Sequence, residues 1–259
     1  MPHFAQVLLS IAVLVSFESQ AQIRAEHVAY KDGNTSLKGY LVYDSKSAAK
    51  RPGIVVVHAW KGLDPFVMKK AEELARLGYT AFAADIYGQD NQPKDAKEAA
   101  TTSSRFKKDR PLLRRRVQLA VNELRKHKTV NKQKLAAMGY CFGGTAVLEL
   151  ARSGSDVLGV VSFHGGLDSE GKQKEKIKAK VLALHGADDP FVPEKDVKHF
   201  EDEMRQAKVD WQLVKYSGAV HSFTNPEAGS DPAKGSAYNK AADRRSWEAM
   251  RDFFAELFK

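Results

Sequence analysis

The 259-residue chain carries 41 lysines and arginines against 32 aspartates and glutamates, a formal net charge of +9 at pH 7, and it contains one cysteine. A single cysteine excludes an internal disulfide, and no nucleic-acid-binding motif accompanies the basic charge, so we expect no nucleic-acid partner. The basic residues alternate with apolar residues at helical spacing, which is typical of a solvated surface that can attract anionic substrates.

The first 21 residues predict a secretory signal. An apolar segment from Phe4 to Phe17 has the length of a signal peptide, and Ser19-Gln20-Ala21 offers a small-x-small cleavage site. Met1-Pro2-His3 carries no Lys or Arg, so the alternatives are an uncleaved anchor or a buried N-terminal element. We expect a secreted or periplasmic protein without stable membrane insertion, in which residues 22–259 form a single domain and Cys141 is a free thiol or pairs between chains.

Along the rest of the chain, apolar runs typical of strands alternate with patterns typical of helices. Strands are predicted at residues 23–30, 37–43, 54–58, 79–84, 134–138, 157–163, 180–185 and 211–216, the first two joined by an Asp-Gly-Asn turn. Helices are predicted from residue 65 to residue 78, from residue 111, directly after residue 141, from 193 to 207 and through 238–257. The polar stretch 87–108 predicts loop and short helix over the sheet edge. This order predicts an α/β fold with a mostly parallel central sheet, helices on both faces and active groups at the carboxyl ends of strands.

Residues 138–144, Met-Gly-Tyr-Cys-Phe-Gly-Gly, have the pattern of a nucleophile elbow, in which a strand ends at a strained residue and a helix begins at once. Gly139 and Gly143 let the strand and the helix approach closely. The residue at the tip is Cys141. A lone cysteine is more often a buried packing residue, but the flanking glycines favour a nucleophile at this position.

An acid and a histidine follow Cys141 in the chain order of α/β-hydrolases, which is nucleophile, acid, base. The acid is Asp188 or Asp189, and either can instead cap the helix that follows. His221 lies in a loop after the last strand, where catalytic groups concentrate. Three other histidines end apolar runs, where a hydrogen-bonded histidine lining the sheet edge is the more common outcome: His58, His164 and His185.

Four motifs together resemble those of the dienelactone hydrolase family, and the resemblance covers the chain from about Pro52 to its end. They are Gly139-Tyr140-Cys141-Phe142-Gly143-Gly144, Ser162-Phe163-His164-Gly165-Gly166, Asp189-Pro190-Phe191-Val192-Pro193 and His221-Ser222-Phe223. The resemblance implies a Cys141, Asp189, His221 triad on an α/β-hydrolase fold, and it places the acid at Asp189.

Two positions depart from the family pattern. Members often carry a glutamate in the loop after the third strand, where it can hold the resting thiol, and the matching residue here is Ala59. In the muconate-pathway enzymes an arginine shortly after the catalytic histidine helps bind a substrate carboxylate, and here Asn225 stands at that place. The resemblance therefore implies hydrolase chemistry and leaves the substrate open.

We therefore predict a hydrolase of activated carboxylic esters or enol lactones that forms a thioester on Cys141. No cofactor and no metal are expected, because neither CxxC nor HExxH occurs. The backbone N–H groups of Trp60 and Phe142 are the expected oxyanion donors, with simple packing as the alternative role of Trp60. The main alternative function is a non-catalytic or redox-sensitive thiol protein on a degenerate hydrolase scaffold, and a peptidase is a third. The sequence predicts neither the oligomeric state nor whether residues 87–108 form a lid.

Overall fold

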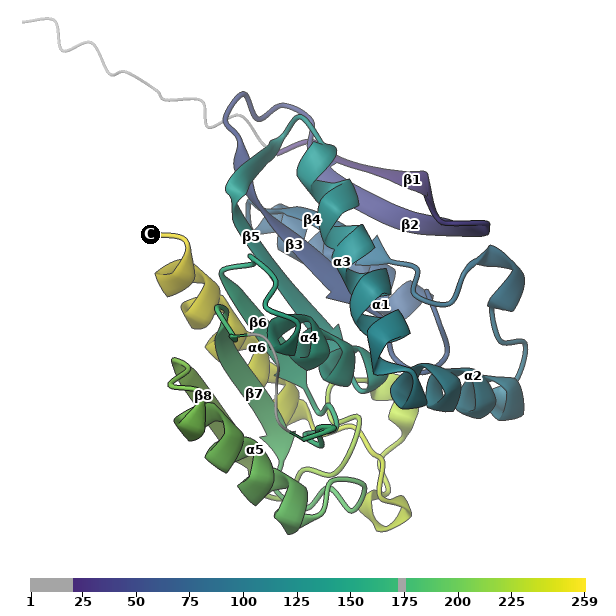
Figure 1. Ribbon diagram of the computed structural model, residues 1–259, viewed down its shortest axis with the longest axis vertical. Coiled ribbons are helices and arrows are strands. Elements are labelled where there is room, and N and C mark those ends of the chain that lie inside the picture. Colours follow the sequence, from purple (N-terminus) through teal and green to yellow (C-terminus); the bar gives the residue numbers. More distant parts are fainter. Residues whose placement is uncertain (1–20, 172–175) are drawn as a thin grey trace, which may run out of the picture.

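The computed structural model describes residues 21–171 and 176–259 (Figure 1). In this part of the chain, one sheet has the strand order β1-β2-β4-β3-β5-β6-β7-β8. The β1–β2 and β2–β4 pairs are antiparallel, and the pairs from β4 to β8 are parallel. The strands are β1 (Ile23–Asp32), β2 (Thr35–Asp44), β3 (Arg51–Val57), β4 (Thr80–Ala84), β5 (Val130–Tyr140), β6 (Gly159–Phe163), β7 (Lys180–Gly186) and β8 (Trp211–Tyr216).

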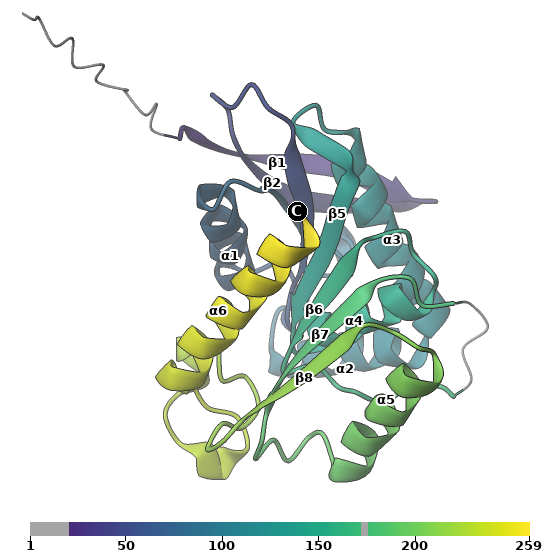
Figure 2. The same cartoon turned by 90° about the vertical axis from the view of Figure 1, so that its left-hand side faces the viewer.

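Helices cover both faces of this sheet. Figure 2 shows α1 and α6 on one side and α3 and α5 on the other. The helices are α1 (Pro65–Arg76), α2 (Ala96–Lys108), α3 (Arg110–Lys126), α4 (Phe142–Arg152), α5 (Glu194–Gln206) and α6 (Lys240–Leu257). The prediction of an α/β fold with a mostly parallel sheet between helices is confirmed.

Most of the predicted secretory signal, residues 1–21, lies outside the described residues, and it stays a prediction. The chain is hydrogen-bonded to the fold from Gln22, whose N–H donates to Asp44 Oδ1 and whose carbonyl accepts from the Ser45 N–H, both at 2.9 Å. Within the two described ranges, no helix is long and apolar enough to cross a bilayer.

Local sequence signals place α1 where the sequence predicted it. Asp64 Oδ1 accepts the Val67 N–H at 3.0 Å, and Pro65 begins the first turn. Gly78, with φ of 93°, lies just beyond the end of the helix. The hairpin of β1 and β2 likewise turns at Gly33, which has φ of 58°.

Helix α2 and strand β5 exceed their predicted lengths most clearly. The polar stretch after residue 87 contains α2, a 13-residue helix capped by Asp95, which buries Ala99 and Phe106. Its other positions are mostly exposed and polar, so the apolar spacing that marks a helix is sparse. Strand β5 begins at Val130 rather than Lys134, because its first residues pair with β3 before a register shift.

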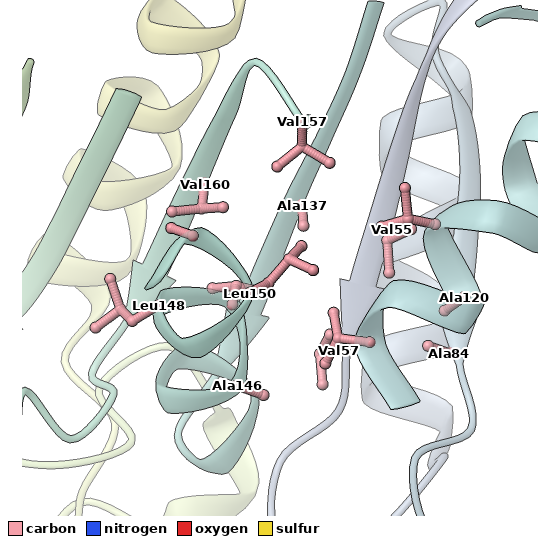
Figure 3. Close-up of a cluster of buried hydrophobic side chains, with 14 of the residues drawn as sticks. Val55, Val57, Ala84, Ala120, Ala137, Ala146, Leu148, Leu150, Val157 and Val160 are labelled. Carbon is pink, nitrogen blue, oxygen red and sulfur yellow. The ribbon is translucent and has the colours of Figure 1, made fainter. Parts of the chain in front are cut away.

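The face of the sheet under α3 and α4 carries one of two apolar clusters (Figure 3). Leu150 of α4 lies in this cluster with Val55 of β3 and Ala137 of β5. On the other face, Val67 of α1 and Phe254 of α6 belong to the second cluster. Because α4 is packed along the sheet, its first turn is held at the carboxyl end of β5.

A buried ion network holds the other end of α4. Arg152, only 1% exposed, pairs with Glu149 of α4 at 2.9 Å and with Glu203 of α5 at 2.8 Å. It also donates to the carbonyls of Leu167 and Asp168, in the segment that follows β6. The helix is therefore joined to α5 and to the β6 loop as well as to the sheet.

We predict that Leu150→Ala lowers the free energy of unfolding by about 2–5 kcal/mol, because it opens a cavity between α4 and the sheet. The matched control is Leu158→Ala, since Leu158 is 36% exposed, and we expect a loss of about 1 kcal/mol or less. Urea unfolding followed by circular dichroism measures both. Equal losses in the two variants would contradict the described packing of α4.

Candidate active site

Cys141 occupies a sharp turn between β5 and α4. Its φ of 54° and ψ of −113° are unusual for a residue other than glycine, and α4 begins at the next residue. A Cβ atom on Gly139 would collide with the Gly143 backbone, and one on Gly143 would collide with the Val57 carbonyl. The close approach that the sequence predicted for these two glycines is confirmed.

The structure brings Cys141, His221 and Asp189 together. Cys141 Sγ lies 3.0 Å from His221 Nε2, and His221 Nδ1 lies 2.8 Å from Asp189 Oδ2. The second Asp189 oxygen accepts the Phe191 N–H at 2.9 Å. The Asp189 side chain is fully buried and the His221 side chain is 14% exposed, whereas Cys141 is partly exposed. The three groups form a continuous row that runs from the buried Asp189 carboxylate to the partly exposed Cys141.

His221 is held in place although it lies in a loop between β8 and α6. Its N–H donates to the Gly235 carbonyl and its carbonyl accepts the Ala237 N–H, both at 3.1 Å. The Phe191 ring meets the imidazole edge-on, with 5.4 Å between ring centroids. The two hydrogen bonds fix the backbone of His221, and the Phe191 ring fixes the orientation of its imidazole.

Cys141 and His221 each shift the pKa of the other toward the charged form. Burial alone would lower the pKa of His221, but the Cys141 sulfur and the Asp189 carboxylate raise it to about 10. Burial alone would raise the pKa of the Cys141 thiol, but His221, the Phe142 N–H and the Lys107 ammonium lower it below its usual value. Both shifts favour a thiolate beside an imidazolium at neutral pH.

The two predicted oxyanion donors lie in different surroundings. Phe142 is the first residue of α4, and its backbone N–H interacts with the Cys141 sulfur. Trp60 is partly buried, packs against the apolar cluster under α3 and α4, and accepts the Tyr87 hydroxyl at its carbonyl at 2.9 Å. The packing role considered for Trp60 is therefore present. The oxyanion role of the two N–H groups stays a prediction.

Sequence reasoning missed Tyr87. Burial and the nearby Cys141 sulfur raise the pKa of this phenol. Its ring contacts Phe142 and also Phe106 of α2, at centroid distances of 5.3 and 5.2 Å. Helix α2 therefore packs beside the Cys141 turn, and the two aromatic residues within the polar stretch, Tyr87 and Phe106, were the sequence signal for this packing.

Only one of the two candidate acids reaches His221. Asp188 Oδ2 instead accepts the Gly218 N–H at 2.9 Å. Neither aspartate caps the helix that follows, because α5 has Pro193 at its N-cap without a side-chain cap bond. Asp189 therefore binds the His221 imidazole, and Asp188 binds the backbone of the loop after β8.

The other buried histidines at the sheet edge differ from one another. His58 Nδ1 lies 2.6 Å from the Ala59 carbonyl, and His164 is bonded at both ring nitrogens. The expectation of a hydrogen-bonded histidine is confirmed for these two. It is wrong for His185, whose Nδ1 is buried without a hydrogen-bond partner in the described part of the chain.

The two departures from the family pattern lie where the sequence placed them. Ala59 follows His58 just beyond β3 and offers no side-chain polar group. Asn225 Oδ1 accepts the Glu227 N–H at 3.0 Å and caps a short 3-10 turn, Pro226–Ala228. Residue 225 therefore shapes a loop. Over residues 21–171 and 176–259, no group of three or more His, Cys, Asp or Glu side chains is placed to hold a metal ion.

We predict that iodoacetamide alkylates Cys141 in the folded protein with a pH midpoint below that of an ordinary thiol, which is about 8.5. The rate should reach its plateau at a lower pH than in the unfolded chain, and it should fall as acid protonates the thiolate. His221→Ala should raise the midpoint, because it removes the neighbouring positive charge. The same chain unfolded in urea is the control, and equal midpoints in the folded and unfolded chains would contradict the ion pair.

Comparison with known proteins gives one consistent family. The model of the dienelactone hydrolase family matches residues 37–258. The chain is similar to the solved structure titled m3DLH, with 37% identity and a TM-score of 0.87 over 92% of this chain and 99% of that one. It is also similar to a dienelactone hydrolase-like promiscuous phosphotriesterase from metagenomic libraries, with 41% identity and a TM-score of 0.84 over the same two shares. A probable 2-oxo-3-(5-oxofuran-2-ylidene)propanoate lactonase of Bradyrhizobium is 28% identical over 66% of this chain and 73% of its own length. Because the family model spans most of the sequence, the chain belongs to the dienelactone hydrolase family.

Proposed function

We propose that this protein hydrolyses activated carboxylic esters or enol lactones through Cys141, His221 and Asp189, with a thioester acyl-enzyme. The observation that carries the proposal is the row of contacts from Sγ to Nε2 at 3.0 Å and from Nδ1 to Oδ2 at 2.8 Å. Membership of the dienelactone hydrolase family supports the reaction class. Similarity to a probable lactonase supports lactones among the substrates.

In the acylation step, the Cys141 thiolate attacks the carbonyl carbon of the ester. The backbone N–H groups of Phe142 and Trp60 stabilise the charge that develops on the carbonyl oxygen. The bond to the leaving oxygen then breaks, and His221 Nε2 gives its proton to that oxygen. Asp189 holds the imidazole through Nδ1 and stabilises its cation.

In the deacylation step, a water molecule gives a proton to the now neutral His221 and attacks the thioester carbonyl. The carbon–sulfur bond breaks, the acid leaves, and the thiolate and imidazolium are restored. A thiolate leaves more readily than a simple alkoxide, so an adduct with an alkyl ester tends to expel sulfur and return to substrate. Substrates with stable leaving groups are therefore favoured, namely enol lactones, phenolic esters and thioesters.

We predict that the protein hydrolyses the phenyl ester of an acid much faster than the ethyl ester of the same acid. Cys141→Ser and His221→Ala should lower kcat/KM for the phenyl ester by about 100-fold or more, because each removes a reacting group. Steady-state rates with both esters measure this.

The control for these two variants is thermal unfolding, which should be close to that of the parent protein. Equal rates for the phenyl and ethyl esters would remove the leaving-group argument. Full activity of folded Cys141→Ser would leave a non-catalytic or redox-sensitive role for the thiol as the better account of this residue.

A second candidate activity is the hydrolysis of aryl phosphotriesters. The observation that favours it is the 41% identity to the protein titled a promiscuous phosphotriesterase. The Cys141 thiolate would attack phosphorus and expel the aryl oxide, giving a phosphorylated thiol that water then cleaves. The same sulfur and imidazole serve both reactions.

We predict that a diethyl aryl phosphate releases its phenol in the presence of the protein and that Cys141→Ser abolishes this release. Absorbance of a nitrophenol leaving group measures the rate. Release of only one phenol per protein chain would indicate attack without turnover. Release that is equal in Cys141→Ser would exclude Cys141 as the attacking group for this substrate.

A further inference from the structure

Three loops at the carboxyl edge of the sheet share an unusual backbone feature. Among the described residues, four non-glycine residues have positive φ, and three of them are in these loops. They are Cys141 after β5 (54°), His164 after β6 (40°) and Ser222 after β8 (57°). Such conformations cost free energy and persist only where the surrounding contacts determine them. A contact that joins the three loops is therefore expected.

His164 makes that contact with both of its ring nitrogens. Nδ1 lies 3.1 Å from the backbone N of Cys141, and Nε2 lies 2.8 Å from Thr224 Oγ1. The Cys141 N–H is shared with the Phe163 carbonyl at 2.9 Å, which is the continuation of the β5–β6 pairing. His164 thus bridges the loop of the nucleophile and the loop of His221.

The bridge fixes the tautomer of His164. A backbone N–H can only donate, so Nδ1 must carry a lone pair and the proton lies on Nε2, which donates to the Thr224 hydroxyl. Both partners are enclosed, because His164 is 2% exposed and Thr224 is 1% exposed. Without the Thr224 hydroxyl the buried His164 Nε2–H would lose its acceptor, which is costly, whereas the Cys141 N–H would keep the Phe163 carbonyl.

His164 also contacts the imidazole of His221. The two rings meet edge to face with 5.3 Å between centroids, and the Phe223 ring packs on His164 at 5.0 Å. The ionisable groups around His164 are His221, His185 and the Tyr140 ring. Burial and the positive charge of His221 hold the pKa of His164 well below its usual value. A neutral His164 is also what the bond from the Cys141 N–H to its Nδ1 requires.

We propose that His164 is a positioning residue that ties the Cys141 loop to the His221 loop through Thr224 and so holds the sulfur against the imidazole. The proposal rests on the proposed function, in which these two groups react. The ring nitrogens of His164 bond the Cys141 backbone N–H and the Thr224 hydroxyl, and they do not bond Cys141 Sγ or His221 Nε2. It acts through the Cys141 backbone on one side and through the His221 loop on the other.

Two variants break the same bond from opposite ends. Thr224→Val keeps the shape of the side chain and removes the hydroxyl. His164→Asn keeps an acceptor for the Cys141 N–H and tolerates positive φ, but it is too short to reach Thr224. Thr224→Ser restores the hydroxyl and serves as the conservative rescue.

A second histidine–threonine pair in the same chain is the matched control. His127 Nδ1 lies 2.8 Å from Thr129 Oγ1, in the segment that enters β5 and therefore at the opposite edge of the sheet. His127→Leu removes the imidazole nitrogens of this pair, and Thr129→Val removes its hydroxyl, which also bonds the Thr80 hydroxyl at 2.8 Å. Neither residue has a part in the proposed reaction.

The test measures the rate of Cys141 alkylation by iodoacetamide against pH, together with kcat and KM for a phenyl ester. We expect Thr224→Val and His164→Asn to slow alkylation at pH 7 by about 10- to 100-fold, since a small displacement of reacting groups has an effect of that size. The pH midpoint of alkylation should rise, and kcat should fall with KM nearly unchanged. The double variant should be no worse than the more affected single variant, because both changes break one bond. Thr224→Ser and the two control variants should behave as the parent protein.

The positioning role of His164 is contradicted if folded Thr224→Val and His164→Asn keep the alkylation rate and pH midpoint of the parent protein. It is also contradicted if the control variants change both quantities equally. Thermal unfolding shows which variants are folded. If His164→Asn does not fold, the comparison of Thr224→Val with Thr224→Ser decides the test. Alkylation needs no ester turnover, so the two proposals can fail separately. A parent protein that hydrolyses no ester, while its variants alkylate as predicted, overturns the proposed function and supports the tie.

Discussion

The contact between the Cys141 sulfur and the His221 imidazole depends on segments 80 residues apart in sequence meeting at one edge of the sheet. Parallel pairing from β4 to β8 directs the carboxyl ends of these strands to that edge. The turn at Cys141 is possible because Gly139 and Gly143 allow strand and helix to approach closely. Helix α4, packed along the sheet and joined to α5 by Arg152, then keeps the turn from relaxing.

The partial burial of this contact shapes its chemistry. Each charge of a thiolate–imidazolium pair is disfavoured by burial alone, and each is stabilised by the other. Asp189 completes the row with both oxygens occupied, one by His221 and one by the Phe191 N–H. The sulfur contacts the imidazole directly, and Ala59 brings no carboxylate to this turn. In the function we propose, this pair is the attacking group, and it is assembled before substrate arrives.

The sequence predicted those features that depend on local pattern. The capped start of α1, the hairpin turn at Gly33 and the alternation of strands and helices along the chain follow from turn residues and apolar spacing. The choice of Asp189 over Asp188 came from the family resemblance. Neither apolar spacing nor turn residues distinguish two adjacent carboxylates. Helix α2 escaped prediction in its full length because few of its side chains are buried.

Tertiary contacts between loops could not be predicted in the same way. The bonds of His164 to Cys141 and to Thr224 join residues 23 and 60 positions apart, and no spacing rule indicates them. The position of Tyr87 against the nucleophile turn likewise depends on α2 folding back over the sheet edge. Local sequence patterns thus indicate where Cys141, Asp189 and His221 lie along the chain. Contacts between loops determine their relative positions in space.

The central claim is that the Cys141 sulfur carries the acyl group during turnover. The most direct measurement mixes the protein with a nitrophenyl acetate, quenches in acid and locates the adduct by peptide mass spectrometry. The account predicts a mass increase of one acetyl group on the peptide that contains Cys141. Hydrolysis of the ester by the parent protein with the acetyl group on another residue, or with no adduct at any time after mixing, would contradict it.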